Sequence, residues 1–117
     1  MRMWNINPQY LCDQHLLGEH VEMHMFAGCI LKDISLEGYI KGGLVELDKL
    51  TVRHNILAEE MVNRGMNHQS IYPSIDTSKF TVKGIVNKAK SIRDLTTRCL
   101  HCREIYFSLQ ARGIQYE

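Results

Sequence analysis

The chain has 117 residues, of which 44% are hydrophobic and 23% charged, and its formal net charge is +1. This length suits one domain with a core that needs no disulfide, and a content of 2 Pro and 8 Gly argues against long disordered regions. No stretch reaches the roughly 18 apolar residues of a membrane span, and the first residues lack the apolar region of a secretory signal. We therefore expect a single cytoplasmic domain over residues 1–117, monomeric and without membrane contact.

The first predicted element is a helix that begins at Asn7-Pro8. Asn is a favoured N-cap and Pro is favoured in the first helical turn, and nothing before about Ala27 except Gly18 interrupts the helix. Residues 31–44 contain three glycines, which predicts a loop or a short turn.

Two further helices are predicted after this loop. Apolar residues at helical spacing predict a helix from Glu46 to about Arg64, followed by a long surface loop over residues 66–80. Residues 80–90 are ambiguous, and a capping-box-like start at Ser91 predicts a third helix that runs to about Arg112. No segment alternates with period two for long. The expected fold is therefore all-α, a compact bundle of about three main helices with long loops.

Charge is distributed unevenly along the chain. Residues 1–78 hold 6 Lys or Arg against 10 Asp or Glu, a net charge of −4, and residues 79–117 hold 8 against 3, a net charge of +5. A basic C-terminal third is typical of a nucleic-acid-binding surface, although solvated helices show the same pattern.

The four cysteines are interpreted as reduced thiols. Cys12 and Cys29 are isolated in the sequence and are expected in the core, whereas Cys99 and Cys102 form one C-x-x-C pair. A four-thiolate zinc site needs two such pairs, and His101 between the two cysteines is badly placed as a ligand. The pair is therefore a structural zinc site, a redox pair or, most simply, two partly buried residues of one helix.

One stripe of the first predicted helix combines ionisable and large apolar residues. Steps of about 100° per residue place His15, Glu19 and Glu22 on the stripe that also carries Leu11 and Phe26. A solvated face would rarely include such apolar ends, so this stripe is a candidate site for acid or base chemistry. The alternative is an ordinary surface pair of His15 and Glu19.

The opposite stripe carries His20 and His24, which have the i,i+4 spacing of zinc-binding helices. Asp13 could supply a third ligand two turns earlier. Because Glu22 is displaced from the position that the zinc motif requires, two packed or exposed histidines are the commoner explanation.

The N-terminal amine is a further candidate. An α-amino group has a pKa near 7.7–8.0, against about 10.4 for lysine, and is therefore the better nucleophile near neutral pH. The bulk of Arg2 should prevent removal of Met1, so the amine is expected to be that of Met1 itself.

A family resemblance connects these features. The runs Arg2-Met3-Trp4-Asn5 and Asp13-Gln14-His15-Leu16, followed by Glu19 and Glu22, resemble the phage-type pyrimidine-dimer DNA glycosylases. Later matches are looser, at Asp48-Lys49-Leu50 and at Arg64-Gly65 followed by Asn67. A second pattern is similar to the smaller cellular members of the family, at Arg53-His54, Glu60-Met61, Arg64-Gly65, His68-Gln69-Ser70 and the segment from Arg98 to Arg103. The resemblance implies an all-α enzyme that cleaves the glycosidic bond of a damaged nucleotide and then nicks the strand as an abasic-site lyase.

The resemblance also implies roles for particular residues. The amine of Met1 attacks C1′ and forms a Schiff base, Glu22 is the catalytic carboxylate, and Arg2 and His15 bind sugar and phosphate at the same site. Further phosphate contacts are expected from Lys32 and from the basic residues of segment 83–98, namely Lys83, Lys88, Lys90, Arg93 and Arg98.

No metal or other cofactor is expected, because the amine performs the covalent step. The substrate would be double-stranded DNA that contains a lesion, most simply a pyrimidine dimer. The phage enzymes carry arginines on both sides of the glutamate where this sequence has Val21 and Met25. A glycosylase for a different modified base, a DNA-binding module without catalysis, and a metal or thiol protein are the alternatives.

Overall fold

The computed structural model describes residues 1–113, and all regular structure in this part of the chain is helical, which confirms the all-α fold. Residues 114–117 of the predicted domain lie outside the described residues. Among the described helices, none has the length and apolar character needed to cross a membrane. In chain order the elements are the 3₁₀ turn η1 (Pro8–Tyr10), α1 (Asp13–Leu31), α2 (Glu37–Lys41), the 3₁₀ turn η2 (Leu47–Lys49), α3 (Leu50–Asn63), α4 (Lys88–Arg98) and α5 (Leu100–Ala111).

The first helix begins later than the sequence predicts. Asn7 and Pro8 start only the turn η1, in which the Asn7 side chain accepts the backbone N–H of Gln9 at 2.9 Å. The chain is then extended at Leu11 and Cys12, so that Cys12 is the N-cap of α1. This break lets the side chains of Tyr10 and Leu11 enter the core, where both are fully buried. At its other end α1 passes the predicted limit at Ala27 and continues to Leu31.

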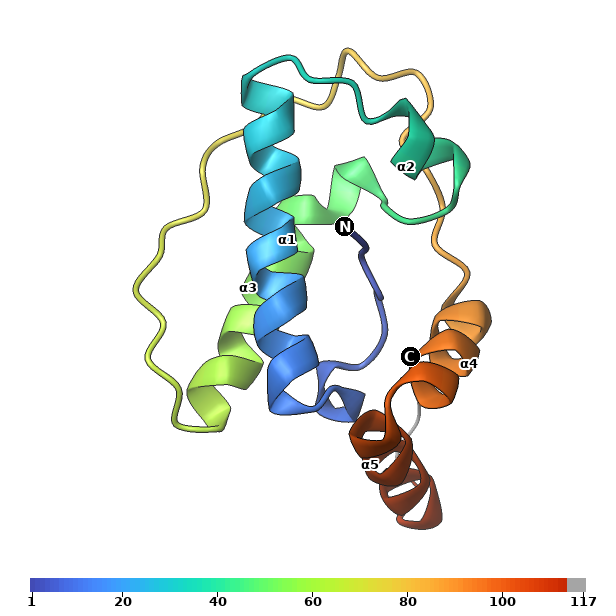
Figure 1. Ribbon diagram of the computed structural model, residues 1–117. Coiled ribbons are helices and arrows are strands. Elements are labelled where there is room, and N and C mark those ends of the chain that lie inside the picture. Colours follow the sequence, from blue (N-terminus) through green and yellow to red (C-terminus); the bar gives the residue numbers. More distant parts are fainter. Residues whose placement is uncertain (114–117) are drawn as a thin grey trace.

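The centre of the fold is the packing of α1 against α3, which lie side by side (Figure 1). The predicted second helix is confirmed, with η2 as its first turn. It contributes a buried apolar stripe to the interface, as does α1. The buried apolar side chains are Leu16, Met23, Phe26 and Ile30 from α1 and Leu50, Leu57 and Met61 from α3.

The predicted third helix is two helices. Asn87 caps α4 through its side-chain oxygen, which accepts the N–H of Lys90 at 2.9 Å, so the helix begins before Ser91. Ser91 is fully buried and makes no cap. Cys99 is extended and separates α4 from α5, whose first turn it caps by accepting the N–H of Cys102 on its sulfur. A helix-compatible sequence is therefore bent at a cysteine, and α5 packs against η1 as well as α4.

The long connection from Arg64 to Asn87 passes around α1 and α3 and returns to α4 (Figure 1). The predicted loop at residues 66–80 is confirmed, whereas the predicted loop at residues 31–44 contains the short helix α2. The connection is held at its return by a hydrogen bond from the N–H of Leu47 to the carbonyl of Lys83 at 2.8 Å. Gly84 is required beside this bond, because its φ is +90° and a Cβ there would collide with the carbonyl of Val45.

Candidate active site at the amino terminus

The first four residues form a non-helical segment that α1 holds through two glutamates one turn apart. The N–H of Trp4 donates to Glu19 at 3.1 Å, and the N–H of Arg2 donates to Glu22 at 3.0 Å. The N–H of Met3 between them points the other way and donates to the carbonyl of Leu44 at 2.7 Å. This alternation fixes the path of the chain up to its first atom, because each successive amide has a partner.

The α-amino group of Met1 lies beside the carboxylate of Glu22. Its nitrogen is 3.7 Å from Glu22 Oε1, the same oxygen that accepts the N–H of Arg2. The Glu22 side chain is 29% exposed and the Met1 side chain 11% exposed, so the pair is sheltered yet open to solvent on one side. A nucleophilic amine and a carboxylate within reach of the same bound atom can perform covalent and proton-transfer chemistry.

Arg2 links this pair to helix α4. Its guanidinium lies 4.0 Å from the centre of the Trp4 ring and donates to Asp94 at 3.0 Å. Asp94 also accepts from Lys90 at 2.6 Å, and hydrogen bonds from Lys90 and then Arg2 lower the pKa of its carboxyl to about 2. Asp94 therefore stays ionised and keeps two cations at the edge of the site.

A cavity of about 480 Å³ opens at this point of the surface, and its size is within the range of small-ligand sites. Most of the predicted site residues line it. Its lining is Met1, Arg2, Trp4, His15, Glu22, Leu44, Lys90 and Arg98. Among residues 1–113, the amine, Arg2, Lys90 and Arg98 face only Glu22 and, at the edge, Asp94. The site is therefore predominantly cationic and suits a phosphate-bearing ligand.

The remaining predicted DNA-binding residues lie outside this cavity. Lys32 is exposed and lines a second cavity of about 430 Å³ that also includes Met1. Val21, Met25 and Ile34 make this second cavity mainly apolar. Lys88 and Arg93 are exposed on α4 and are not among the residues that line either cavity.

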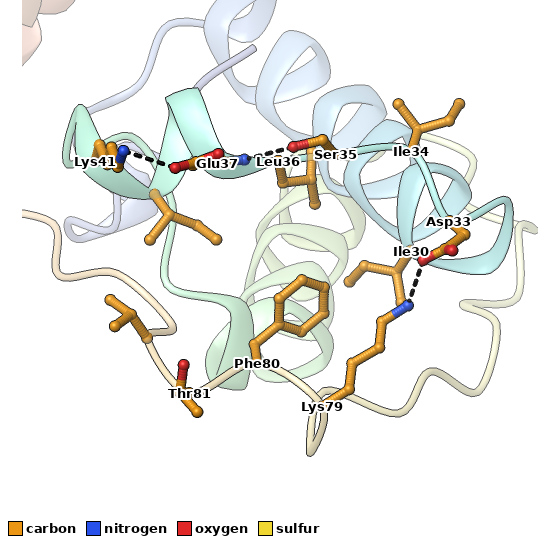
Figure 2. Close-up of a pocket in the computed structure, with 12 residues that line it drawn as sticks. Ile30, Asp33, Ile34, Ser35, Leu36, Glu37, Lys41, Lys79, Phe80 and Thr81 are labelled. Atoms are coloured by element: carbon orange, nitrogen blue, oxygen red, sulfur yellow. Dashed lines mark hydrogen bonds and ion pairs between the residues drawn. The ribbon is translucent and has the colours of Figure 1, made fainter.

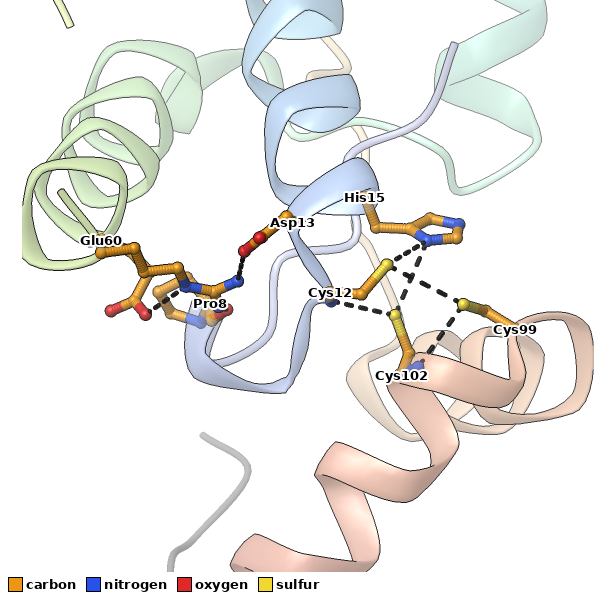
Figure 3. A network of polar contacts seen from close by, with 8 residues as sticks. Pro8, Cys12, Asp13, His15, Glu60, Cys99 and Cys102 are labelled. Atoms are coloured by element: carbon orange, nitrogen blue, oxygen red, sulfur yellow. Dashed lines mark hydrogen bonds and ion pairs between the residues drawn. The ribbon is translucent and has the colours of Figure 1, made fainter. Parts of the chain in front are cut away.

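His15 belongs to two surroundings at once. It lines the cationic cavity, and its ring meets the Trp4 ring edge to face at 6.1 Å. Its Nδ1 is turned to two sulfur atoms, at 3.3 Å from Cys12 and 3.6 Å from Cys102 (Figure 3). Any contact of His15 with DNA would therefore use the other ring nitrogen.

Glu19 has a partner that the sequence reasoning missed. Arg53 on α3 binds both of its carboxylate oxygens, at 2.7 and 2.8 Å, and donates to the carbonyl of Ile6 at 2.6 Å. Both side chains are buried, and the surface pair of His15 and Glu19 does not form. Arg53 lies on the apolar stripe of its helix, between Leu50 and Leu57. A charged residue on this stripe indicates a buried ion pair, and it was the signal in the sequence that could have revealed the partner of Glu19.

Histidines from three segments converge on the other side of α1. The Nε2 atom of His20 lies 3.1 Å from Nε2 of His54 and 2.9 Å from Nε2 of His68. These nitrogens could together hold a metal ion. Burial, together with the charges of His54, His24 and His68, lowers the pKa of His20 to about 4. Asp13, the third ligand considered from the sequence, instead pairs with Arg64 at 2.9 Å.

A second group of potential metal ligands joins Cys12 and His15 to Cys99 and Cys102. The sequence reasoning considered the C-x-x-C pair alone. The missed signal was Cys12-x-x-His15, which repeats the same spacing at the start of α1. Cys29 is not part of this group.

A further cavity lies elsewhere and is mainly apolar. It has a volume of about 540 Å³ and lies between the end of α1, helix α2 and residues 79–82 (Figure 2). Phe80, Ile30 and Leu36 supply apolar walls, and ion pairs of Lys79 with Asp33 and of Lys41 with Glu37 lie at its rim. It shares no residue with the cavity that contains Glu22, so we assign it no part in the chemistry there.

Comparison with known proteins decides between the classes that this geometry allows. A family model described as pyrimidine dimer DNA glycosylase matches residues 1–73, which is 73 of the 117 residues. The chain belongs to this family of DNA glycosylases. The match confirms the resemblance inferred from the sequence and identifies a DNA-repair glycosylase whose substrate is DNA. It includes Met1, Arg2, His15 and Glu22, whereas helices α4 and α5 lie beyond it. No curated protein and no solved structure matches the glycosylase.

Proposed function

We propose that this glycosylase cleaves the glycosidic bond of a pyrimidine dimer in double-stranded DNA and then nicks the strand as an abasic-site lyase, with the Met1 amine as nucleophile. The observation that carries the proposal is the Met1 nitrogen 3.7 Å from Glu22 in a cavity lined by cations. A lysine would be mostly protonated at neutral pH, whereas a sizeable fraction of an ordinary α-amino group is neutral.

In the first step the amine of Met1 replaces the nucleobase at C1′ of the damaged nucleotide. The neutral amine attacks C1′ of the damaged nucleotide, and the bond between C1′ and the base nitrogen breaks with its electron pair leaving on the base. One proton of the attacking nitrogen passes through Glu22 to the departing base. As the bond between C1′ and O4′ breaks and the sugar ring opens, the second proton passes to O4′, and a Schiff base between Met1 and C1′ results. Glu22 is placed to stabilise the positive charge that develops at C1′ and the ring oxygen, and to accept protons from the amine.

The second step breaks the strand. A base removes one proton from C2′ of the Schiff base, and the electron pair expels the 3′ phosphate from C3′ by β-elimination. Water then hydrolyses the conjugated imine and releases the amine of Met1. Glu22 is the carboxylate closest to this chemistry, and we assign it the proton transfers of both steps. Neither step needs an oxidant, a reductant or a metal.

The cations around the cavity are assigned to the DNA backbone. Arg2, Lys90 and Arg98 are close enough to Met1 to hold the phosphates that flank the damaged nucleotide, and His15 offers its outer ring nitrogen. Lys32 lines the neighbouring cavity formed by Val21, Met25 and Ile34, and Lys88 and Arg93 extend the basic surface along α4. The damaged nucleotide or its partner must leave the base stack to reach the amine.

The choice of a pyrimidine dimer over another modified base rests on the family. The apolar cavity formed by Val21, Met25 and Ile34 beside Met1 suits the stacking surface of an extruded base. We propose a monomer, because all the groups of this mechanism come from one chain.

The test is the isosteric variant Glu22→Gln compared with Glu59→Gln, which alters an exposed carboxylate of α3. Gln keeps an oxygen that accepts the N–H of Arg2, so the fold should survive. We expect nicking of dimer-containing and abasic duplexes to fall by about 100-fold or more in Glu22→Gln, with DNA affinity retained and Glu59→Gln unaffected.

The same assay separates the alternatives. Unchanged nicking in Glu22→Gln would remove this residue from the mechanism. Nicking of abasic but not dimer-containing DNA by the parent protein would keep the lyase and point to another modified base. DNA binding without nicking, unaffected by acetylation of the N-terminus, would identify a non-catalytic DNA-binding module.

A further inference from the structure

The second site of interest lies where the start of α1 meets the junction of α4 and α5. Cys12 is the N-cap of α1 and His15 lies in its first turn, while Cys99 is the N-cap of α5 and Cys102 lies in its first turn. Two x-x spaced pairs, 87 residues apart in the chain, thus present their side chains to each other (Figure 3). Three sulfur atoms and one imidazole nitrogen all lie within 4.8 Å of one another.

Three distances between these atoms are close to the edges of a metal tetrahedron. Zinc bonds of about 2.3 Å to sulfur and about 2.0–2.1 Å to nitrogen place two sulfurs about 3.8 Å apart, and a sulfur about 3.5 Å from a nitrogen. The Sγ atoms of Cys12 and Cys99 are 3.9 Å apart, and His15 Nδ1 is 3.3 Å from Cys12 and 3.6 Å from Cys102. The 3.9 Å between the sulfurs of Cys12 and Cys99 is too long for a disulfide, whose bond is about 2.05 Å, and all four cysteines are free.

The backbone supports thiolate ligands at this point. The N–H of Cys12 donates to the sulfur of Cys102 at 3.2 Å, and the N–H of Cys102 donates to the sulfur of Cys99 at 3.4 Å. Donors of this kind orient metal-bound ligands and stabilise their negative charge. Cys12 and Cys102 are buried, and Cys99 and His15 are partly buried, so the group is largely sheltered from solvent.

We propose that Cys12, His15, Cys99 and Cys102 bind one Zn²⁺ ion through Sγ, Nδ1, Sγ and Sγ. Thiolates with an imidazole in tetrahedral array favour zinc over magnesium or calcium, and four protein ligands leave no open position. The site is therefore structural. On binding, the three thiols release their protons to solvent, and no redox change occurs.

The zinc site connects the two parts of the glycosylase that form the cationic cavity. Two ligands belong to α1, which carries Glu22, and two belong to the junction after α4, which carries Lys90 and Arg98. His15 is itself part of the cavity lining. The metal thus fixes the basic helix α4 next to Met1. This role replaces the simplest interpretation of the sequence, in which Cys99 and Cys102 are only two partly buried residues of one helix.

The first test measures metal in the full-length protein, purified without an affinity tag from zinc-containing medium. Elemental analysis should give one zinc ion per chain for this site. After replacement of zinc by Co²⁺, the absorption spectrum should show the charge-transfer band of cobalt bound to thiolates. Cys102→Ser should lose both signals. Two matched controls should keep the cobalt signal: Cys29→Ser, which alters a cysteine outside the group, and His68→Ala, which removes one of the converging histidines.

A second measurement needs no variant and remains decisive if Cys102→Ser does not fold. A mercurial thiol reagent is added stepwise to the wild-type protein while an indicator dye detects free zinc. Zinc should be released in step with loss of the thiols. Three results would overturn the proposal. The protein takes up neither zinc nor cobalt, zinc stays bound after complete modification of the thiols, or protein purified without oxygen contains a disulfide among these cysteines.

Discussion

The nitrogen of Met1 and the backbone N–H of Arg2 both meet Oε1 of Glu22, at 3.7 and 3.0 Å. The second contact holds the peptide that carries the amine, so the amine stands beside the carboxylate before any substrate arrives. Such preorganisation removes the entropic cost of bringing nucleophile and proton acceptor together. Glu19, one turn earlier on α1, accepts the backbone N–H of Trp4 in the same way and holds the next part of the N-terminal segment against the protein interior.

The buried ion pair of Glu19 and Arg53 should stabilise the folded protein and the N-terminal segment that Glu19 holds. Glu19→Gln leaves the Arg53 guanidinium buried without a compensating charge, which costs about 3–5 kcal/mol of unfolding free energy. Chemical denaturation of this variant beside Glu59→Gln measures the loss. Addition of Arg53→Leu removes the unpaired charge and should recover part of the stability. An unchanged denaturation midpoint in Glu19→Gln would contradict the role given to the pair.

The basic lining of the cavity should appear in the salt dependence of DNA binding. Each phosphate contact contributes about −0.9 to the slope of log K against log salt concentration for duplex DNA. Lys90→Ala should therefore make the slope shallower by about one such contact. Lys41→Ala, which alters an exposed lysine on α2, is the control and should leave the slope unchanged. Equal slopes for the two variants would place the DNA elsewhere on the surface.

The histidine group should make the protein sensitive to acid. Burial and the neighbouring imidazoles lower the pKa of His20 from 6.5 to about 4, so the unfolded chain binds more protons between these values. Stability from neutral His20 is thus complete above pH 6.5 and is lost as the pH falls toward 4. Thermal unfolding at a series of pH values should show this decline. His20→Asn should weaken the decline and His101→Asn, at an exposed position, should not.

The sequence predicts the helices well where their cause is local. The spacing of Leu50, Leu57 and Met61 defines one face of α3, and the stripe with Glu19 and Glu22 is correctly identified as unlike a solvated face. Caps and periodicity depend on neighbouring residues, so they can be read along the chain.

The cap expected at Ser91 is a local error, since Asn87 is the cap. The other errors fall where distant contacts decide the backbone. Cys99 interrupts a run of residues that is compatible with one helix, and it lies against Cys12 from the other end of the chain. Similarly, His54 and His68 reach His20 only because α3 and the following loop pack on α1. No local sequence pattern specifies such long-range contacts. The sequence did, however, contain the same two-residue spacing twice, in Cys12-x-x-His15 and in Cys99-x-x-Cys102.

The most direct test of the central claim is a borohydride trap. The protein is mixed with duplex DNA that contains a pyrimidine dimer, an abasic site or no lesion, the imine is reduced, and the adduct is located by peptide mass. We predict an adduct on the peptide that begins with Met1 for both damaged duplexes and none for undamaged DNA. No adduct from folded protein with a confirmed free amine, or an adduct on a lysine instead, would contradict the account.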